Sequence, residues 1–377
     1  MSASARTVLV VSHHGKIVGG GEISLLTLLK GLHRTNWLPV VVVPCQGAVA
    51  EHCEALGLRV HVIPLPTLRR PGPSTLGSIF ALRNLIRSSA AALIHANGSR
   101  AMFYAGLAGR LARRPVIWHL RILEPDSSLD WLLVRLATAT IATSQAVHQR
   151  LRRWPRAYEA CTIVPNGLDL DDFRGTGNPR QLRDSLELAA TDRVVITVGR
   201  LVGFKRQMLL LEAVALLRPR FPHIKCIIVG EGPEGTALES RAQRQDLAGA
   251  VIMAGHRDDI PDMLGISELF VLPSPAEHFG RVLLEAMAAS LPVVAAAAAG
   301  PAEIVEDGGT GLLVNPEDPA ALAEAMAKLL DDPQLARELG RSGCRRVHDL
   351  YSMHRHAELM ERAFDALTFD PLGTRDR

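Results

Sequence analysis

Short runs of β-branched residues alternate with longer amphipathic segments, and this alternation limits the possible folds more than any other feature of the chain. A buried parallel strand is predicted at TVLVVS (7–12) and a helix at EISLLTLLKGLH (22–33), because leucines recur there at helical spacing. Further strands are predicted in the same half at 39–44, 59–64, 91–97, 114–120 and 139–144. Strand–helix alternation predicts a doubly wound parallel sheet, whose ligands bind at the carboxyl ends of the strands.

The pattern restarts after a Pro-Asn-Gly turn in TIVPNGLD (162–169) and a hinge at GTGNPR (175–180). Since 377 residues is roughly twice the usual domain size of ~100–200, we expect two Rossmann-like α/β domains facing each other across a cleft. Their predicted bounds are 1–174 and 175–352, followed by a helix and tail at 353–377 that cross back to the N-terminal domain. Strands of the second domain are predicted at 193–199, 224–230, 250–255, 269–274 and 292–297.

The composition excludes several other classes of protein. Hydrophobic residues make up 47% of the chain, enough for a large core, yet no apolar run reaches the ~18–20 residues of a membrane-spanning helix. The apolar VLVV near the N-terminus is too short for a signal peptide, so we expect a soluble, cytoplasmic protein. The five cysteines never stand in CxxC spacing, which predicts neither a disulfide framework nor a zinc site.

The net charge of +3 is unevenly distributed. Residues 1–175 carry 20 Lys/Arg against 10 Asp/Glu, whereas the remainder carries 22 against 29. Most of the excess lies in 69–156, which predicts an anionic partner such as a phosphate-bearing substrate, an acidic membrane surface or nucleic acid. Nucleic acid is the least favoured of the three, because aromatic residues do not interleave with the arginines.

Two glycine clusters follow predicted strands. Gly19-Gly20-Gly21 stands between the first strand and the first helix, where free N–H groups suit a phosphate, although a simple tight turn is the alternative. The second cluster, GEGPEG (230–235), satisfies the dinucleotide fingerprint GxGxxG. We reject NAD binding there, because Glu231 and Glu234 would repel a pyrophosphate and Pro233 removes an N–H donor.

Two cationic and two acidic residues follow predicted strands in the second half of the chain. Gly199-Arg200 and Lys205 follow its first strand, where the two cations can neutralise a diphosphate, or can simply be solvated. Glu277 lies in the loop after another strand, and Glu285 lies one turn inside the helix that Gly280 opens. The two carboxylates can accept sugar hydroxyls, form an acid/base pair, or be solvated.

These motifs occur together in the order typical of one family. Glu277-x7-Glu285 within EHFGRVLLEAMA resembles the EX7E signature of retaining glycosyltransferase family 4, which has the GT-B fold. GR-x4-K (199–205), VPNGLD (164–169), VGEGPEG (229–235) and GPAEIVEDGGTGLLVNPED (300–318) resemble further motifs of that family. The N-terminal GGGEISLLTLLKGL resembles the start of its acceptor domain, so the similarity covers nearly the whole chain.

The resemblance implies a role for each matching residue. Arg200 and Lys205 would bind the donor diphosphate and stabilise the leaving nucleotide. His119, at a strand end in VIWHLRI, matches the family's active-site histidine, although an isolated histidine after an apolar strand is more often structural. The implied catalytic residues are Arg200, Lys205, Glu277 and His119. The implied donor-binding residues are Gly20, Gly21, Gly199, Arg200, Lys205, Glu277, Phe279, Gly280, Glu285, His256 and Arg257, with His95, Asn97 and Arg121 as acceptor-side candidates.

The function implied is the retaining transfer of a hexose-type sugar from a UDP- or GDP-sugar to a hydroxyl of a glycan or lipid-linked acceptor. No cofactor and no metal are expected, because fixed cations replace a divalent ion, and cell-envelope polysaccharide or glycolipid synthesis is the expected setting. A sugar-nucleotide epimerase of the same fold and a non-catalytic sugar-nucleotide-binding module are the alternatives. Segment 69–156 would dock on an anionic leaflet with Trp131 or Trp154 at the interface, or is a solvated arginine-rich surface.

Three departures from the family pattern leave the sugar and the acceptor open. Ser290 stands where a glycine is usual, Gly300-Pro301 replaces a double glycine, and Asn97 replaces a frequent histidine.

Overall fold

A computed structural model of the chain describes residues 5–34, 36–68, 72–126, 129–173, 175 and 177–368. The chain divides into two compact units: unit 1 comprises Met1–Gly167 and Met353–Arg377, and unit 2 comprises Leu168–Ser352. The first boundary therefore falls at Gly167, before the boundary at 174/175 expected from the sequence. The predicted hinge at 175–180 lies in unit 2, and its Thr176 is outside the described residues.

Unit 1 is built on a seven-stranded parallel sheet of order β3-β2-β1-β4-β5-β6-β7. Its strands are β1 (Arg6–Val11), β2 (Trp37–Val43), β3 (Arg59–Val62), β4 (Leu93–Asn97), β5 (Val116–Leu120), β6 (Ala139–Ala142) and β7 (Thr162–Ile163). Its helices are α1 (Gly20–Gly31), α2 (Ala48–Ala55), α3 (Pro73–Ser88), α4 (Ser99–Ala112), α5 (Asp130–Leu136), α6 (Gln145–His148), η1 (Gln149–Leu151), α7 (Pro155–Glu159) and α16 (Met353–Thr368). Each predicted strand of this half is present, whereas the two-residue β7 was not predicted.

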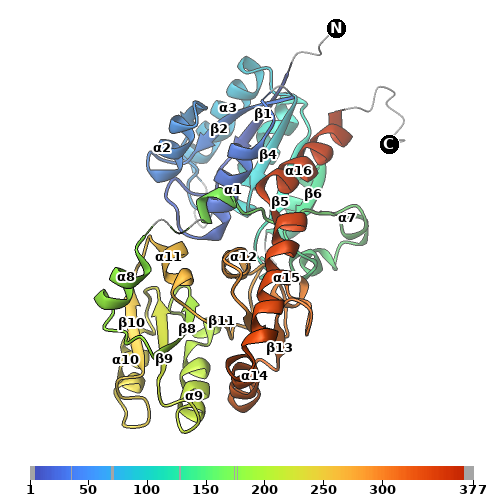
Figure 1. The fold of residues 1–377 in the computed structure, drawn as a ribbon. Helices are drawn as coiled ribbons and strands as arrows, with labels where there is room; N and C mark the ends of the chain where they lie inside the picture. The colour runs from blue at the N-terminus through green and yellow to red at the C-terminus, as the bar shows by residue number, and fades with distance from the viewer. Residues whose placement is uncertain are drawn as a thin grey trace. The chain divides into compact units, whose positions relative to one another are not determined.

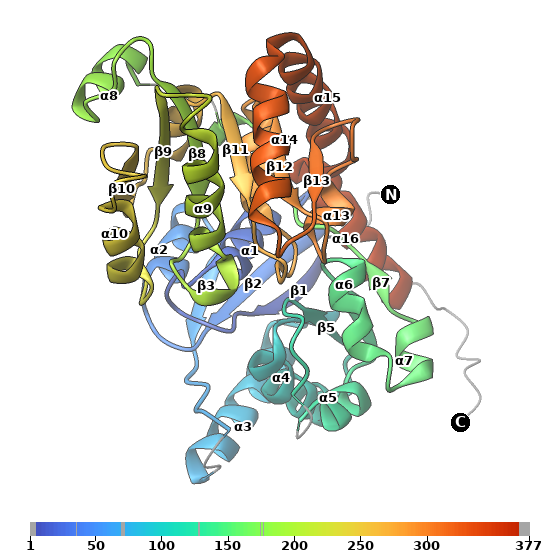
Figure 2. The ribbon, with the colours of Figure 1, turned by 90° about the horizontal axis from the view of Figure 1, so that it is seen from below.

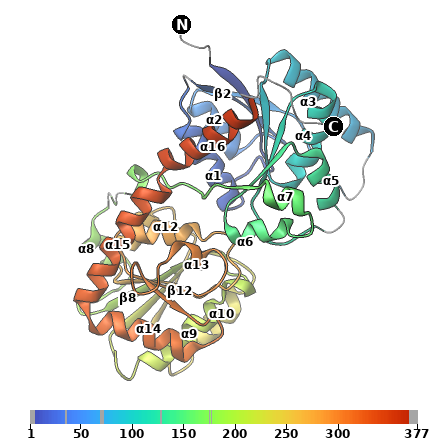
Figure 3. The ribbon, with the colours of Figure 1, turned by 90° about the vertical axis from the view of Figure 1, so that its right-hand side faces the viewer.

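Helices cover both faces of this sheet (Figure 3). The layer of α3, α4 and α5 buries one core, which includes Leu82, Tyr104 and Leu133. On the other face, α1, α2 and α16 bury a second core. Because both faces are covered, the inner strands β1, β2, β4, β5 and β6 consist largely of buried apolar residues, which is why the sequence shows them as apolar runs, whereas the edge strand β3 is mostly exposed.

Unit 2 repeats the architecture with a six-stranded parallel sheet of order β10-β9-β8-β11-β12-β13. Its strands are β8 (Arg193–Val198), β9 (Ile224–Val229), β10 (Val251–Gly255), β11 (Leu269–Leu272), β12 (Val293–Ala296) and β13 (Leu312–Val314). Its helices are η2 (Asp171–Phe173), α8 (Pro179–Ser185), η3 (Gly203–Lys205), α9 (Gln207–Leu217), α10 (Gly235–Ala242), α11 (Ile260–Gly265), α12 (Arg281–Ala288), α13 (Pro301–Ile304), α14 (Pro319–Asp331) and α15 (Pro333–Tyr351). Helices α9 and α14 cover one face of this sheet (Figure 2), and α11, α12 and α15 pack against the other. The short strand β13 was not predicted.

Strand order locates the ligand-binding edges. In each sheet the winding reverses between two neighbouring strands, β1 and β4 in unit 1 and β8 and β11 in unit 2. Connections from these strands leave toward opposite faces, which opens a crevice at their carboxyl ends. Candidate site residues are therefore expected after these four strands, and most of them lie there.

The C-terminal helix α16 belongs to unit 1, where it lies beside α1 (Figure 1). Its Phe364 is fully buried, with its ring 5.3 Å from that of Trp37. The Glu361 carboxylate accepts a hydrogen bond from the backbone N–H of His33 at 2.8 Å. A Cβ at Gly31 would lie 2.7 Å from Met353 Cγ, so the glycine allows the two helices to approach closely. Residues 369–377 of the predicted tail lie outside the described part.

We predict that Phe364→Ala destabilises unit 1 by about 3–5 kcal/mol, because the substitution leaves a cavity beneath α16. Hydrogen exchange of β1 and β2 should become faster, whereas exchange of β8 and β9 in unit 2 should not change. Leu350→Ala, at a half-exposed position on α15, is the matched control. Equal protection of β1 and β2 in the parent and in Phe364→Ala would show that α16 does not hold this core together.

Candidate active site

The structure joins two of the predicted donor-binding residues of unit 2 in an ion pair. Lys205 ends η3 after β8, and its Nζ donates to Glu277 Oε1 in the loop after β11. Only 14% of the Lys205 side chain and 10% of the Glu277 side chain are exposed. Ser274 also joins these loops, because its hydroxyl donates to the carbonyl of Phe204 at 3.0 Å. The pair therefore sits at the crevice of unit 2, where an anionic ligand would compete with Glu277 for the ammonium group.

Arg200 lies close to Lys205 in the chain, but its surroundings differ from those of the ion pair. It is exposed, and within the described ranges its guanidinium makes no hydrogen bond or ion pair. Its backbone carbonyl is held by Gln207, whose Nε2 donates to it at 3.0 Å. Because its backbone is held in place while its guanidinium has no partner among the described residues, Arg200 is suited to bind a ligand.

The GEGPEG motif supports the loop that carries Arg200. A Cβ at Gly230 would lie 2.0 Å from the carbonyl oxygen of Gly199, and one at Gly232 would lie 2.3 Å from that of Leu201. The N–H of Leu201 in turn donates to the carbonyl of Glu231 at 2.9 Å. These glycines therefore allow close backbone packing, which explains a dinucleotide-like spacing without any ligand at that motif.

Glu285 has a partner that the sequence analysis missed. Arg281, one turn earlier in α12, donates from Nε to Glu285 Oε1 at 2.9 Å. Burial raises the pKa of Glu285, and Arg281 acts against that rise. Arg281 Nη1 is buried and has no hydrogen-bond partner among the described residues. The i,i+4 spacing of the two residues was the available sign of this pair.

Backbone packing fixes the loop between Glu277 and α12. The N–H of Gly300 donates to the carbonyl of Glu277 at 3.1 Å, and a Cβ at Gly300 would lie 2.2 Å from the carbonyl oxygen of Phe279. Phe279 itself is buried against Tyr351, so only its backbone remains for a ligand. Gly280, the N-cap of α12, has a φ of 98°, a conformation that favours glycine. Gly300 is thus required, whereas Pro301 is accommodated as the first residue of α13.

His256 and Arg257 follow β10 at the margin of the sheet and not at its crevice. Arg257 is paired with Asp259, and the exposed His256 ring lies 3.3 Å from Asp258. Their proposed contact with a base remains a prediction.

In unit 1 the three glycines are free of packing constraints. Gly19 is the N-cap of α1, and its N–H donates to the Glu22 carboxylate at 3.2 Å. A Cβ at Gly19, Gly20 or Gly21 would meet no heavy atom within 4 Å. Internal packing therefore gives no reason for three glycines here, whereas close approach of a ligand does.

The other predicted residues of unit 1 form a buried polar cluster at the ends of β4 and β5. His95 Nε2 lies 3.0 Å from His119 Nδ1. Arg121 donates from Nε to Asn97 Oδ1 at 2.8 Å and from Nη1 to Ser24 Oγ at 2.9 Å. A further bond from Arg121 Nη1 reaches Asn166 Oδ1 at 2.5 Å.

Ser24 and Asn166 complete this cluster, and the sequence analysis did not assign either of them. Asn166 stands in the Pro-Asn-Gly turn that the sequence shows plainly. Nothing in the sequence places it beside Ser24, whose hydroxyl donates to Asn166 Oδ1 at 2.7 Å. His356 of α16 lies nearby, and its Nδ1 donates to the carbonyl of Pro165 at 2.6 Å.

Burial and one cation keep the histidines of this cluster neutral. Burial, followed by the charge of Arg121, lowers the pKa of both His95 and His356 to about 3 and that of His119 well below its usual range. Burial also lowers the pKa of Arg121 to about 9, although the Glu22 carboxylate acts in the opposite direction. His119 Nε2 and Arg121 Nη2 are buried without a partner among the described residues. Such unpaired atoms require an explanation, and a bound hydroxyl or anion supplies one.

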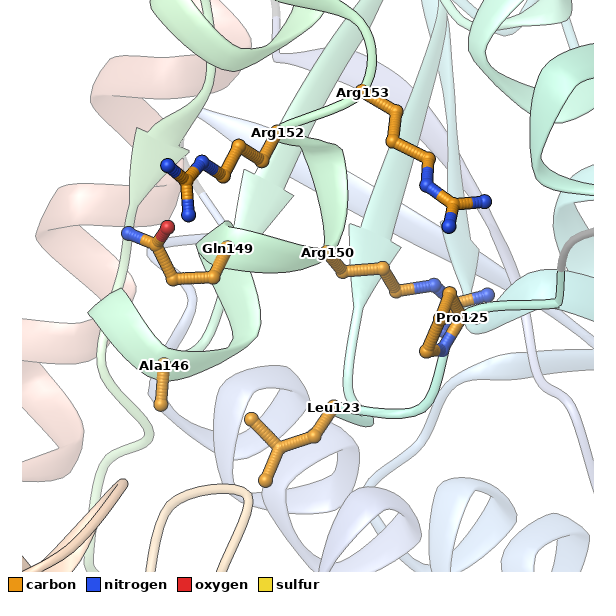
Figure 4. A pocket seen from close by; sticks show the side chains of 7 residues that line it. All are labelled: Leu123, Pro125, Ala146, Gln149, Arg150, Arg152 and Arg153. Carbon is orange, nitrogen blue, oxygen red and sulfur yellow. The ribbon is translucent and has the colours of Figure 1, made fainter.

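A separate cavity of about 540 Å³ opens in unit 1 around η1 (Figure 4). It is lined by Leu123, Pro125, Ala146, Gln149, Arg150, Arg152 and Arg153. Arg150 does not supply a free charge there, because it is buried and paired with Asp130 at 2.6 Å. Arg150 therefore does not contribute to the expected docking of segment 69–156 on an anionic leaflet, since Asp130 holds its guanidinium inside the fold.

Glycosyltransferase families account for this combination of fold and site. A family model described as Glycosyltransferase Family 4 matches residues 18–172, and one described as Glycosyl transferases group 1 matches residues 179–346. Together with the two Rossmann-like sheets, these matches define a glycosyltransferase of the family 4 type with the GT-B fold.

Individual relatives agree with this class. The chain is 32% identical over 225 residues to a D-inositol 3-phosphate glycosyltransferase of Streptomyces avermitilis, over 56% of this chain and 48% of the relative. It therefore spans about half the length of that relative. It is 28% identical to the α-D-kanosaminyltransferase of Streptomyces kanamyceticus, over 75% of this chain and 82% of the relative.

Among solved structures, HepE of Anabaena in complex with UDP superimposes with a TM-score of 0.83 at 25% identity, covering 96% of this chain and 100% of HepE. A complex of HepE with UDP-glucose gives a TM-score of 0.82 at 27% identity, over 96% and 100% of the two chains.

Within the described ranges, no helix is both long and apolar enough to cross a bilayer. The same residues contain no group of three or more His, Cys, Asp or Glu side chains placed to hold a metal ion.

Two glycine substitutions should separate ligand binding from folding. We predict that Gly20→Ala leaves the melting temperature unchanged or raises it, because alanine favours a helix by about 1 kcal/mol over glycine. The same substitution should weaken UDP binding at least tenfold. Gly230→Ala should instead lower the melting temperature, because its Cβ collides with the carbonyl of Gly199. Unchanged UDP affinity in a folded Gly20→Ala variant would show that the glycine is only part of a turn.

The neutral histidines predict an acid-sensitive unit 1. Below pH 6.5 the unfolded chain binds protons that buried His356 does not bind until about pH 3, so stability falls as the pH falls through this window. We expect His356→Gln to remove about 1.4 kcal/mol per pH unit of that dependence between pH 6 and 4. Denaturant unfolding at several pH values measures the slope, and exposed His348→Gln is the control. Identical slopes for the parent and His356→Gln would contradict the assignment.

Proposed function

We propose that this protein is a retaining, metal-independent glycosyltransferase that moves a hexose-type sugar from a nucleoside diphosphate donor to an acceptor hydroxyl. The observation that carries the proposal is the shielded Lys205–Glu277 pair at the crevice of unit 2, with the unpaired guanidinium of Arg200 beside it in the chain. This arrangement presents cations for a diphosphate and a carboxylate for sugar hydroxyls at one edge of a sheet. The complexes of HepE with UDP and UDP-glucose favour a UDP-sugar over a GDP-sugar.

Lys205 and Arg200 would hold the donor diphosphate and stabilise the charge that develops on the leaving nucleotide. Binding of a phosphate would draw the Lys205 ammonium away from Glu277, which frees that carboxylate for a sugar hydroxyl. The backbone of Phe279 and Gly280 would contact the same sugar, and Glu285, held by Arg281, would accept hydrogen bonds from the ribose. Since these cations are covalently part of the chain, no divalent ion is required.

Unit 1 would supply the acceptor side and part of the phosphate site. Gly20 and Gly21 would approach the diphosphate through free backbone N–H groups at the start of α1. His119 Nε2 and Arg121 Nη2, two of the unpaired atoms of the buried cluster, would bind hydroxyl groups of the sugar or the acceptor. His95 and Asn97 would act through these two residues, because each is hydrogen-bonded to one of them.

The chemical step exchanges one bond at the anomeric carbon for another on the same face. The bond from C1 to the phosphate oxygen breaks, and its electron pair leaves with the nucleotide. The acceptor oxygen bonds to C1, and its proton passes to the departing phosphate. We propose a glycan or lipid-linked acceptor of cell-envelope polysaccharide or glycolipid synthesis.

Nucleotide release from UDP- and GDP-sugars, measured with glycan and lipid-linked acceptors, tests this proposal. Lys205→Ala and Glu277→Gln should each lower turnover by about 10²–10³-fold, because a preorganised charge at the reacting phosphate or sugar is lost. Lys225→Ala and Glu268→Gln, at surface positions of unit 2, are the matched controls and should leave turnover unchanged.

Each alternative outcome of these assays would lead to a different conclusion about the function. Parental turnover in Lys205→Ala and Glu277→Gln would remove the proposed site. A donor isomerised without acceptor would identify an epimerase, and tight UDP binding without turnover would identify a binding module. An inverted anomeric configuration in the product would exclude the retaining step.

A further inference from the structure

The arginine excess of unit 1 lies in a stretch of the chain that has no carboxylates. The protein has 39 acidic residues, yet none occurs between Glu54 and Glu124, a segment that contains ten arginines. This segment forms β3, α3, β4, α4 and β5. The arginines of this segment therefore have no acidic residue within the segment with which they could form an ion pair.

Helix α3 combines this charge with exposed apolar side chains. Leu76 and Phe80 are 60% and 52% exposed. Arg83 and Arg87 follow at helical spacing, which places all four on one side of the helix. The adjoining side of α3 buries Ile79, Leu82 and Ile86 in the core beneath it. Figure 2 shows α3 at the margin of the α3–α4–α5 layer.

The end of α4 extends the same surface. Arg87 Nη2 donates to the carbonyl of Leu111 at 3.3 Å, and the Leu111 side chain is 47% exposed. Exposed Arg110 and Arg113 flank Leu111 in the chain. We define the α3 face as Leu76, Phe80, Arg83, Arg87 and Leu111.

Other parts of the arginine-rich segment contribute less. Arg121 and Arg150 are held inside the fold by hydrogen bonds, and Arg69 and Arg70 lie outside the described residues. Trp154 is only partly exposed, because it packs against the core of unit 1. Trp131 is exposed, with Arg135 above its ring at 5.3 Å.

We propose that the α3 face docks on an anionic membrane surface. Leucine and phenylalanine side chains enter the boundary between headgroups and acyl chains, while arginines bind the phosphates above it. A soluble polyanion would use the arginines but would have no use for the two exposed apolar side chains. The start of α3 and the His119–Arg121 cluster lie at the same edge of the sheet, because helices of a parallel sheet begin where its strands end.

Co-sedimentation with vesicles tests the docking independently of sugar transfer. The full chain should bind vesicles of phosphatidylcholine with 30% phosphatidylglycerol, and should bind pure phosphatidylcholine at least tenfold more weakly. Leu76→Ser/Phe80→Ser should lower the partition coefficient at least tenfold, and Arg83→Gln and Arg87→Gln about fivefold each. Leu216→Ser, at an exposed position of α9 in unit 2, and Arg218→Gln, at the partly exposed C-cap of that helix, are the controls and should bind as the parent does.

A tryptophan at position 80 locates the contact directly. Phe80→Trp should show emission that brominated phosphatidylglycerol vesicles quench, whereas Leu216→Trp should add no quenched emission. All variants should retain the parental melting temperature and UDP affinity, so a loss of vesicle binding reports on the surface alone. Equal vesicle binding by Leu76→Ser/Phe80→Ser and the parent would overturn the proposal. Binding of soluble polyphosphate without any binding of vesicles would overturn it as well and would indicate a soluble anionic partner.

Discussion

The reversal of winding in each sheet is the constraint on which the rest of the molecule depends. Between β1 and β4, and again between β8 and β11, neighbouring strands send their connections to opposite faces. The diverging connections leave a crevice at the carboxyl ends of these strands. The open N-terminus of α1 lies at the crevice of unit 1, and the unpaired His119 Nε2 and Arg121 Nη2 lie at the end of β5, the strand next to β4. Topology, rather than any single motif, produces these binding edges.

The two units use charge differently at these edges. In unit 2 a cation faces a carboxylate, Lys205 against Glu277, so an anion that binds the ammonium group leaves a nearly buried carboxylate that needs hydrogen-bond donors of its own. In unit 1 one guanidinium, that of Arg121, stands among neutral imidazoles and amides. Neutral groups can bind the hydroxyls of a ligand without the free-energy cost of removing a second charge from water. This difference suits a charged donor in one unit and an uncharged hydroxyl in the other.

Most of the fold could be predicted from the sequence, because strands buried on both faces are continuous apolar runs. β7 and β13 were missed since two or three residues are too few to form a visible run. Lys205 and Glu277 could be named from motifs, but their pairing spans 72 positions and required the sheet order. Ser24 and Asn166 were missed for the same reason, and so was the pairing of Arg150 with Asp130, which lies on a different helix. Contacts between distant segments are what the sequence does not display.

The position of α16 has a consequence for the order of events during synthesis. A ribosome releases unit 1 first, yet the helix that covers Trp37 and His95 is encoded at the very end of the described chain. Unit 2 is continuous from Leu168 to Ser352 and can complete its core before α16 emerges. The N-terminal unit must therefore wait, with part of its apolar surface uncovered, for the last helix of the chain. A premature stop near residue 352 would leave the later unit intact and damage the earlier one.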